Sequence, residues 1–190
     1  MLAFLEDVWS RSFLNYFGSP LTITEYVAGL VVMSIITSTA GFLLMAILAG
    51  TLFGYSIFTL GILLIPFLAI LFTFGLSIGI FIAGFVFRFG PAAEWLAWLI
   101  AFVLSPFAGV FYPISVLPAP FQIVAKLIPA AYVFEGMRGI LSTRRTAISP
   151  LLIGTALACL YVIWAYLFFV RIYHVASKSG LITRFSAEQM

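Results

Sequence analysis

Few residues in the sequence could carry out catalysis, and those few lack the partners that a catalytic site needs. The 190 residues include one histidine, His174, and one cysteine, Cys159. A single histidine cannot build a multi-histidine zinc site, and the cysteine lies in an apolar run without a base to activate it. We interpret His174 as an interfacial residue and Cys159 as a small packing residue.

The acidic pair Glu6 and Asp7 is the remaining candidate for acid and base chemistry. Adjacent residues on a helix point in different directions, so the two carboxylates cannot act together. The sequence also lacks the G-x-x-x-x-G-K-[ST] loop that binds nucleotide phosphates. We predict no active site, no metal and no cofactor bound by this chain, and hence a protein that is not an enzyme.

Three other polar residues recur at three-residue steps. Tyr132, Glu135 and Arg138 would share one face of a helix, where Glu135 and Arg138 can form an ion pair. At an interface such a pair stabilises a helix by only a few tenths of a kcal/mol, and the pattern favours this plain interpretation. The alternative is that the pair pins its segment against neighbouring helices as an outer gate.

The composition indicates that these residues belong to a membrane protein. The chain is 64% hydrophobic and 8% charged, whereas soluble domains contain roughly 25% charged residues. The net charge of +3 is small, so we expect no nucleic-acid partner. The N-terminus lacks the basic segment and apolar run of a signal peptide, and we expect none to be removed.

No charged residue lies between Glu25 and Arg88. One membrane crossing needs about 20 helical residues, so this run predicts two crossings, at 26–48 and 56–87. The stretch GTLFGYS supplies the turn between them. Pro66 falls inside the second crossing and predicts a kink or a tilt there.

Two more crossings complete a predicted all-α membrane fold of about four transmembrane helices. The third is expected at 92–112 and the fourth at 149–171, followed by a cytoplasmic tail at 172–190. None of the four has an ionisable side chain at mid-depth. Because proton- and sodium-coupled carriers use such groups, any uphill transport would need another subunit to supply the energy.

The segment between the last two crossings is apolar but contains many prolines. Two short helices are predicted, at 120–128 and 130–141, and neither is long enough to cross the hydrocarbon layer. We predict that residues 113–145 form a re-entrant helical hairpin, shaped by Pro113, Pro118 and Pro129. The alternative is an amphipathic connector that lies flat on the outer interface.

Two further patterns concern contacts with other elements. Residues 1–20 predict an amphipathic helix, either an interfacial anchor or a cytoplasmic docking helix. Gly75, Gly79 and Ala83 form a row of small residues on the second crossing, which would permit close helix packing within one subunit or between two.

Two stretches resemble a known family. SPFAGVFYPISVLPAPFQIVAKLIPAAYVFEGMRGIL, residues 105–141, resembles the extracellular end of the type-2 permease family of ABC transporters. LEDVWSRSFLNYFGSPLTITEY, residues 5–26, is similar to the coupling helix of that family and the start of the following span. Family members usually have six spans, two of them before the coupling helix, so the resemblance implies that the first two spans are missing here.

The resemblance implies a single-domain exporter permease in the cell membrane, in bacteria the inner membrane. Such a permease forms a homodimer or heterodimer, works by alternating access, and binds ABC ATPase subunits that hold the ATP. The residues implied at or near the ATPase contact are Glu6, Asp7, Trp9, Arg11 and Phe13. The alternative is a non-transporting membrane scaffold that recruits a partner through its N-terminal helix.

Overall fold

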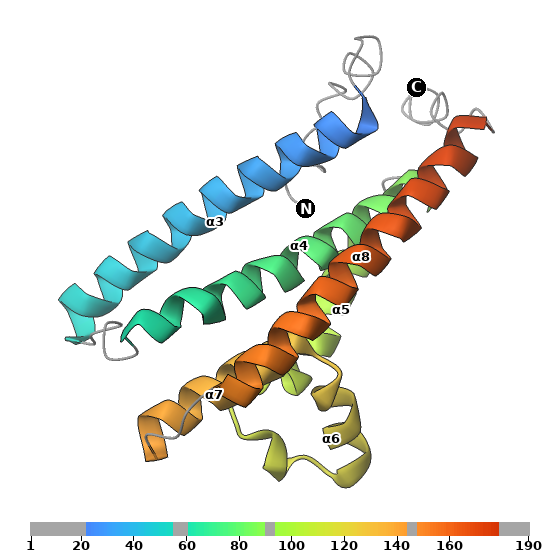
Figure 1. Cartoon of the computed structure of the whole chain (residues 1–190). Coiled ribbons are helices and arrows are strands. Elements are labelled where there is room, and N and C mark those ends of the chain that lie inside the picture. The colour runs from blue at the N-terminus through green and yellow to red at the C-terminus, as the bar shows by residue number, and fades with distance from the viewer. Residues whose placement is uncertain (1–21, 55–60, 90–93, 144–147, 179–190) are drawn as a thin grey trace. The chain divides into compact units, whose positions relative to one another are not determined.

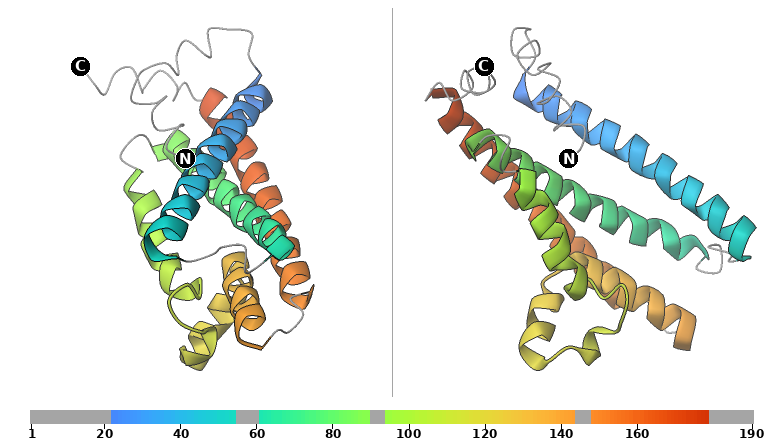
Figure 2. Two further views of the ribbon diagram at one scale, coloured as in Figure 1. Left: turned by 90° about the vertical axis from the view of Figure 1, so that its left-hand side faces the viewer. Right: turned by 180° about the vertical axis from the view of Figure 1, so that it is seen from behind.

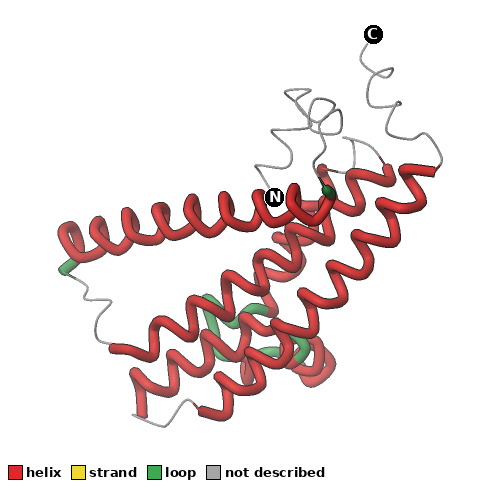
Figure 3. Tube along the Cα trace, turned by 45° about the horizontal axis from the view of Figure 1, so that its top comes forward, coloured by secondary structure: helices red, strands yellow, loops and turns green. Residues whose placement is uncertain are grey.

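The computed structural model describes residues 22–54, 61–89, 94–143 and 148–178 (Figure 1). Every regular element in these ranges is a helix (Figure 3), which confirms the all-α fold class. The chain divides into two units, Met1–Thr59 and Leu60–Met190. The predicted helix at 1–20 and the end of the predicted tail lie outside the described residues.

The first unit contains helix α3, Ile23–Phe53, and its sequence sets both ends. Thr22 and Glu25 form a capping box, in which the Glu25 carboxylate accepts a hydrogen bond from the Thr22 backbone N–H at 2.8 Å. Gly54 ends the helix with a φ of 64°, a conformation that glycine adopts without strain. The helix therefore extends beyond the predicted 26–48 at both ends, and Thr24–Phe53 is apolar and long enough to cross a membrane.

The second unit is built on two long helices, α4 at Leu64–Phe89 and α8 at Ile148–Lys178, which pack side by side (Figures 1 and 2). Their apolar spans are Gly61–Val86 and Ile148–Ile172. Pro66 falls in the first turn of α4, where its missing N–H removes no bond within the helix. Pro66 therefore gives no cause for a kink inside α4, and the predicted tilt stays a prediction.

Helix α8 confirms the predicted fourth crossing but continues into the predicted tail. No glycine or proline interrupts residues 171–178, so the helix runs on to Lys178. Aromatic rings line its contact with α4, where the ring centroids of Phe81 and Phe168 lie 4.7 Å apart. Gly84 permits this approach, because a Cβ there would lie 3.1 Å from Phe168 Cε1.

The predicted third crossing, 92–112, is shorter in the structure. Helix α5 spans Glu94–Leu104 and passes into a 3-10 turn, η3, at Ser105–Phe107. Eleven helical residues extend ~16 Å, about half of the ~30 Å hydrocarbon layer. Pro106 explains the early end, because it cannot donate to a carbonyl in the preceding turn and disfavours helical backbone at Ser105.

The two predicted short helices are present as α6, Ala119–Lys126, and α7, Pro129–Thr143. A second 3-10 turn, η4, precedes them at Ile114–Val116. The prolines of this region lie at the starts of helical pieces. They are Pro106 in η3, Pro113 before η4, Pro118 and Pro120 at α6, and Pro129 at α7. Pro113 is thus the residue before η4, and α5 ends well before it, at Leu104.

The core places the junction between α6 and α7 at a defined level along the two long helices. Ile128, Ala130 and Ala131 form a buried cluster with Phe74, and Tyr161 packs against it. Phe74 and Tyr161 lie near the middle of their apolar spans and contact each other edge to face, with ring centroids 5.5 Å apart. The junction therefore packs at the level of the middle of both crossings.

Gly136 marks the closest approach of α7 to its neighbours. A Cβ on this residue would lie 2.8 Å from Phe67 Cζ and 3.2 Å from Pro150 Cβ. Phe67 is fully buried beside Val133, so its ring has no space into which to move. Any side chain at position 136 would have to separate α7 from α4 and α8.

We predict that Gly136→Ala destabilises the protein by about 2 kcal/mol, the usual cost of overpacking a filled core. The matched control is Gly139→Ala on the same helix, where a Cβ would meet nothing within 4 Å. The control should be neutral or up to about 1 kcal/mol more stable, since alanine favours helix over glycine. Unfolding of both purified variants in detergent checks this, and equal stabilities would contradict the close packing.

Candidate functional site

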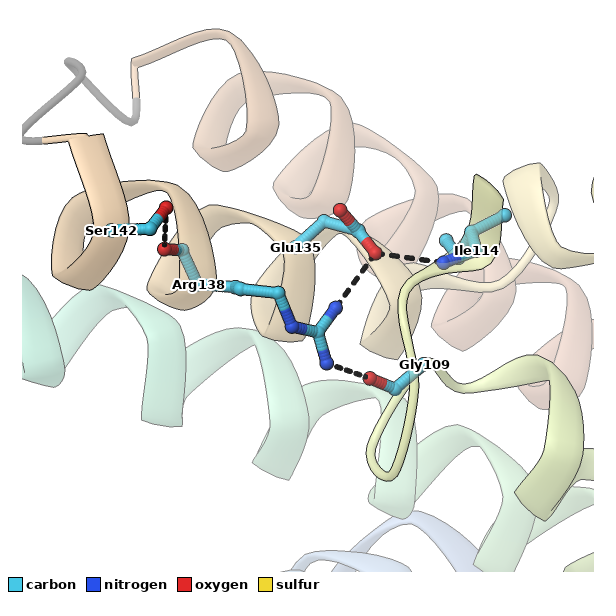
Figure 4. A network of polar contacts seen from close by, with 5 residues as sticks. All are labelled: Gly109, Ile114, Glu135, Arg138 and Ser142. Carbon is cyan, nitrogen blue, oxygen red and sulfur yellow. Dashed lines mark hydrogen bonds and ion pairs between the residues drawn. The ribbon is translucent and has the colours of Figure 1, made fainter. Parts of the chain in front are cut away.

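The polar residues of α7 face the non-helical backbone between η3 and α6 (Figure 4). Glu135 Oε1 accepts two hydrogen bonds, from Ile114 N at 2.9 Å and from Arg138 Nη1 at 2.8 Å. Arg138 Nη2 donates to the Gly109 carbonyl oxygen at 2.9 Å. We call Glu135 and Arg138, with these two backbone groups, the clasp.

The geometry of the clasp follows from local backbone conformation. Residues three apart on a helix lie on one face, which brings the Glu135 carboxylate to the Arg138 guanidinium. Gly109 has a φ of 72°, which glycine tolerates and which turns the chain after η3 toward α7. The planar guanidinium can then bridge a carboxylate and a carbonyl at once.

The structure thus gives the Glu135 and Arg138 pair more contacts than a plain ion pair has. The two side chains are 37% and 33% exposed, so solvent or headgroups can screen their attraction. Their bonds to Ile114 and Gly109 join segments that are far apart in the sequence. Losing either side chain would leave a backbone group without its partner, which costs more than losing an exposed ion pair.

Two further side chains bond to backbone carbonyls in the same region. Tyr132 donates from its hydroxyl to the Lys126 carbonyl at 2.9 Å, at the end of α6. Gln122 donates from Nε2 to the Leu117 carbonyl at 2.8 Å. The sequence pattern identified Tyr132 but missed Gln122, although a lone amide in an otherwise apolar stretch was a usable signal.

The prolines also reduce the number of backbone groups that lack a hydrogen-bond partner. A proline has no N–H, so each of the five prolines between Ser105 and Pro129 removes one donor that would otherwise need an acceptor. In lipid an unsatisfied backbone group costs several kcal/mol. Prolines and polar side chains together lower the number of unsatisfied groups in this stretch.

Within this chain the row of small residues on α4 is only partly covered, and its packing against a second subunit stays a prediction. Ala83 is buried, whereas Gly75 is exposed and a Cβ there would meet nothing within 4 Å. Gly84, outside the predicted row, makes the tight contact with α8. Cys159 is exposed on α8, so its prediction as a packing residue is wrong.

The predicted ATPase contacts Glu6, Asp7, Trp9, Arg11 and Phe13 lie outside the described residues. Within the described part of the chain, no group of three or more His, Cys, Asp and Glu residues could hold a metal ion. Ser77, a buried polar residue of α4, donates from its hydroxyl to the Phe74 carbonyl of the same helix at 2.6 Å. Hydroxyls that bond within their own helix are compatible with a membrane span.

Among the described residues, three helices are long and apolar enough to cross a membrane, and two short helices lie between the last two of them. The family model described as ABC-2 type transporter matches residues 8–142, more than half of the chain. The protein therefore belongs to the ABC-2 type transporter family, and the predicted family resemblance is confirmed. No curated protein and no solved structure matches the chain.

The clasp predicts a specific result for a charge reversal. In Glu135→Arg with Arg138→Glu the ion pair can reform, but arginine cannot accept from Ile114 N and a carboxylate would face the Gly109 carbonyl. We expect the double variant to stay about 2 kcal/mol less stable than wild type, because those backbone bonds remain broken. Unfolding in detergent measures this, and recovery of wild-type stability would reduce the clasp to a plain ion pair.

Proposed function

We propose that the protein is the membrane permease subunit of an ATP-driven exporter, with energy supplied by separate ABC ATPase subunits. The match to the ABC-2 type transporter family over residues 8–142 is the observation that carries this proposal. The sequence supports it, because α3, α4 and α8 contain no Asp, Glu, Lys, Arg or His in the middle of their apolar spans. Such a chain lacks the groups with which proton- and sodium-driven carriers sense their ion.

The proposal includes a substrate path formed by alternating access in a dimer of permeases in the cell membrane. The ATPase would dock on the segment that contains Glu6, Asp7, Trp9, Arg11 and Phe13. Aromatic side chains commonly supply most of the binding energy at such contacts, so Trp9 and Phe13 are the residues to test.

We expect an ABC ATPase from the same cells to co-purify with this chain and to depend on it for turnover. Trp9→Ala should weaken the complex by about 2 kcal/mol, roughly thirtyfold in affinity, since it removes a large apolar contact. The matched control, Phe53→Ala, removes an aromatic ring at the C-terminal end of α3 and should leave binding unchanged.

The outcomes of this experiment separate the candidate functions. A stable complex whose ATPase turnover does not depend on this chain would favour the membrane scaffold. Failure of any ATPase to bind would remove the exporter function. An equal loss of binding in both variants would place the contact elsewhere.

We further propose that α6 and α7 form a re-entrant hairpin within the membrane. Two observations support it over a flat interfacial connector. The α6–α7 junction packs against Phe74 and Tyr161, which lie near the middle of their crossings. The Lys126 carbonyl near the junction has a side-chain partner in Tyr132, and the Leu117 carbonyl before α6 has one in Gln122, as backbone in lipid requires.

Depth measurements test the hairpin directly. In a Cys159→Ala background, a fluorophore is attached to Leu127→Cys at the junction or to Leu141→Cys near the far end of α7, both exposed leucines. The label at 127 should be quenched more by nitroxides near the ends of the lipid chains, and the label at 141 more by nitroxides near the headgroups. Equal shallow quenching at both positions would establish the flat connector.

A further inference from the structure

The segment that the clasp holds is partly exposed. Residues 109–117, which we call the connector, run from Gly109 to the residue before Pro118. Phe111 is 80% exposed and Val116 is 70% exposed, and within the connector Ile114 packs against the core cluster around Phe74. Gln122 of α6 donates to the Ser115 and Leu117 carbonyls of the connector, and the clasp joins the connector to α7.

Helix α7, in contrast, is fixed on its opposite side. Val133 and Ala131 are fully buried, and Gly136 sits against Phe67 and Pro150 without space for a methyl group. Moving α7 would break close packing along α4 and α8. Moving the connector would expose Ile114, the buried Gly109 and parts of Tyr112, Pro113 and Leu117, but it would leave the packing of Gly136 intact. If these two segments separate, the connector is the one that moves.

The clasp is built so that its two contacts depend on each other. One oxygen, Glu135 Oε1, accepts from both Ile114 and Arg138, so the guanidinium holds the carboxylate where the Ile114 N–H can reach it. The carboxylate in turn neutralises the guanidinium that binds the Gly109 carbonyl. Loss of either side chain leaves the other charge without its partner, so the bonds at Gly109 and Ile114 should weaken together.

We propose that the connector is a lid that opens from α7, and that Glu135 and Arg138 are its latch. Gly109, which ends η3 with a positive φ, is the hinge. The opening itself requires only this chain. Its use as the outer gate of a substrate path rests on the proposed exporter function.

Hydrogen exchange of the full chain in lipid nanodiscs tests the latch. The variants are Glu135→Ala, Arg138→Ala and the double substitution. Arg138→Lys is a milder variant that keeps the charge but cannot bridge carboxylate and carbonyl as a fork. Ser142→Ala is the matched control, because its hydroxyl bonds only to the Arg138 carbonyl within α7.

We expect amide exchange in the connector to accelerate roughly tenfold in each single variant, as for the loss of about one hydrogen bond. The double variant should be no faster than the singles, and exchange in residues 131–140 should stay at the wild-type rate. The control should match wild type throughout.

Three results would each overturn the latch. The first is an unchanged exchange rate of the connector amides in all variants. The second is an equal acceleration of exchange in the connector and in α7. The third is an acceleration in the double variant equal to the product of those in the two single variants. The measurement needs no ATPase, so it can fail while the ATPase still co-purifies. Loss of the ATPase complex would remove the exporter function and leave the latch standing.

Discussion

Every backbone N–H and C=O in a lipid environment needs a partner, and this requirement explains most of what lies between α5 and α8. The long helices meet it within themselves, as the intrahelical bond from Ser77 shows even for a side chain. The stretch from Ser105 to Pro129 cannot, because its backbone is mostly in short pieces. It meets the requirement by replacing donors with prolines and by receiving bonds from Gln122, Tyr132, Glu135 and Arg138.

The second unit contains two kinds of packing. Around Gly136 and Gly84 the helices approach so closely that a methyl group would meet a buried or stacked phenylalanine. Beside the connector, contacts are polar and partly exposed. Rigid packing on one side of α7 and polar bonds on the other give a fixed element next to a segment that can be released.

The sequence predicted the elements whose signals are local. The uncharged run after Glu25 predicted the first two crossings, and the prolines predicted both short helices. The end of the third crossing was predicted too late in the chain. The apolar residues continue after Pro106, and hydrophobicity alone does not reveal where a helix is broken. The three-residue spacing brought Tyr132, Glu135 and Arg138 to one face, but their partners are backbone groups such as Gly109 O, which no residue pattern displays. The row of Gly75, Gly79 and Ala83 was limited in the same way, because the small size of a residue does not show whether it faces a neighbouring helix.

The length of α8 has a mechanical consequence. The helix runs unbroken from Ile148, near the Gly136 contact, to Lys178, beyond the end of the apolar span at Ile172. Its 31 residues extend ~46 Å, and Phe169 and Ile172 near its far end are buried. Because α8 is packed near both ends, a rearrangement beside the hairpin would reach the far membrane surface through a joint movement of α8 and α4.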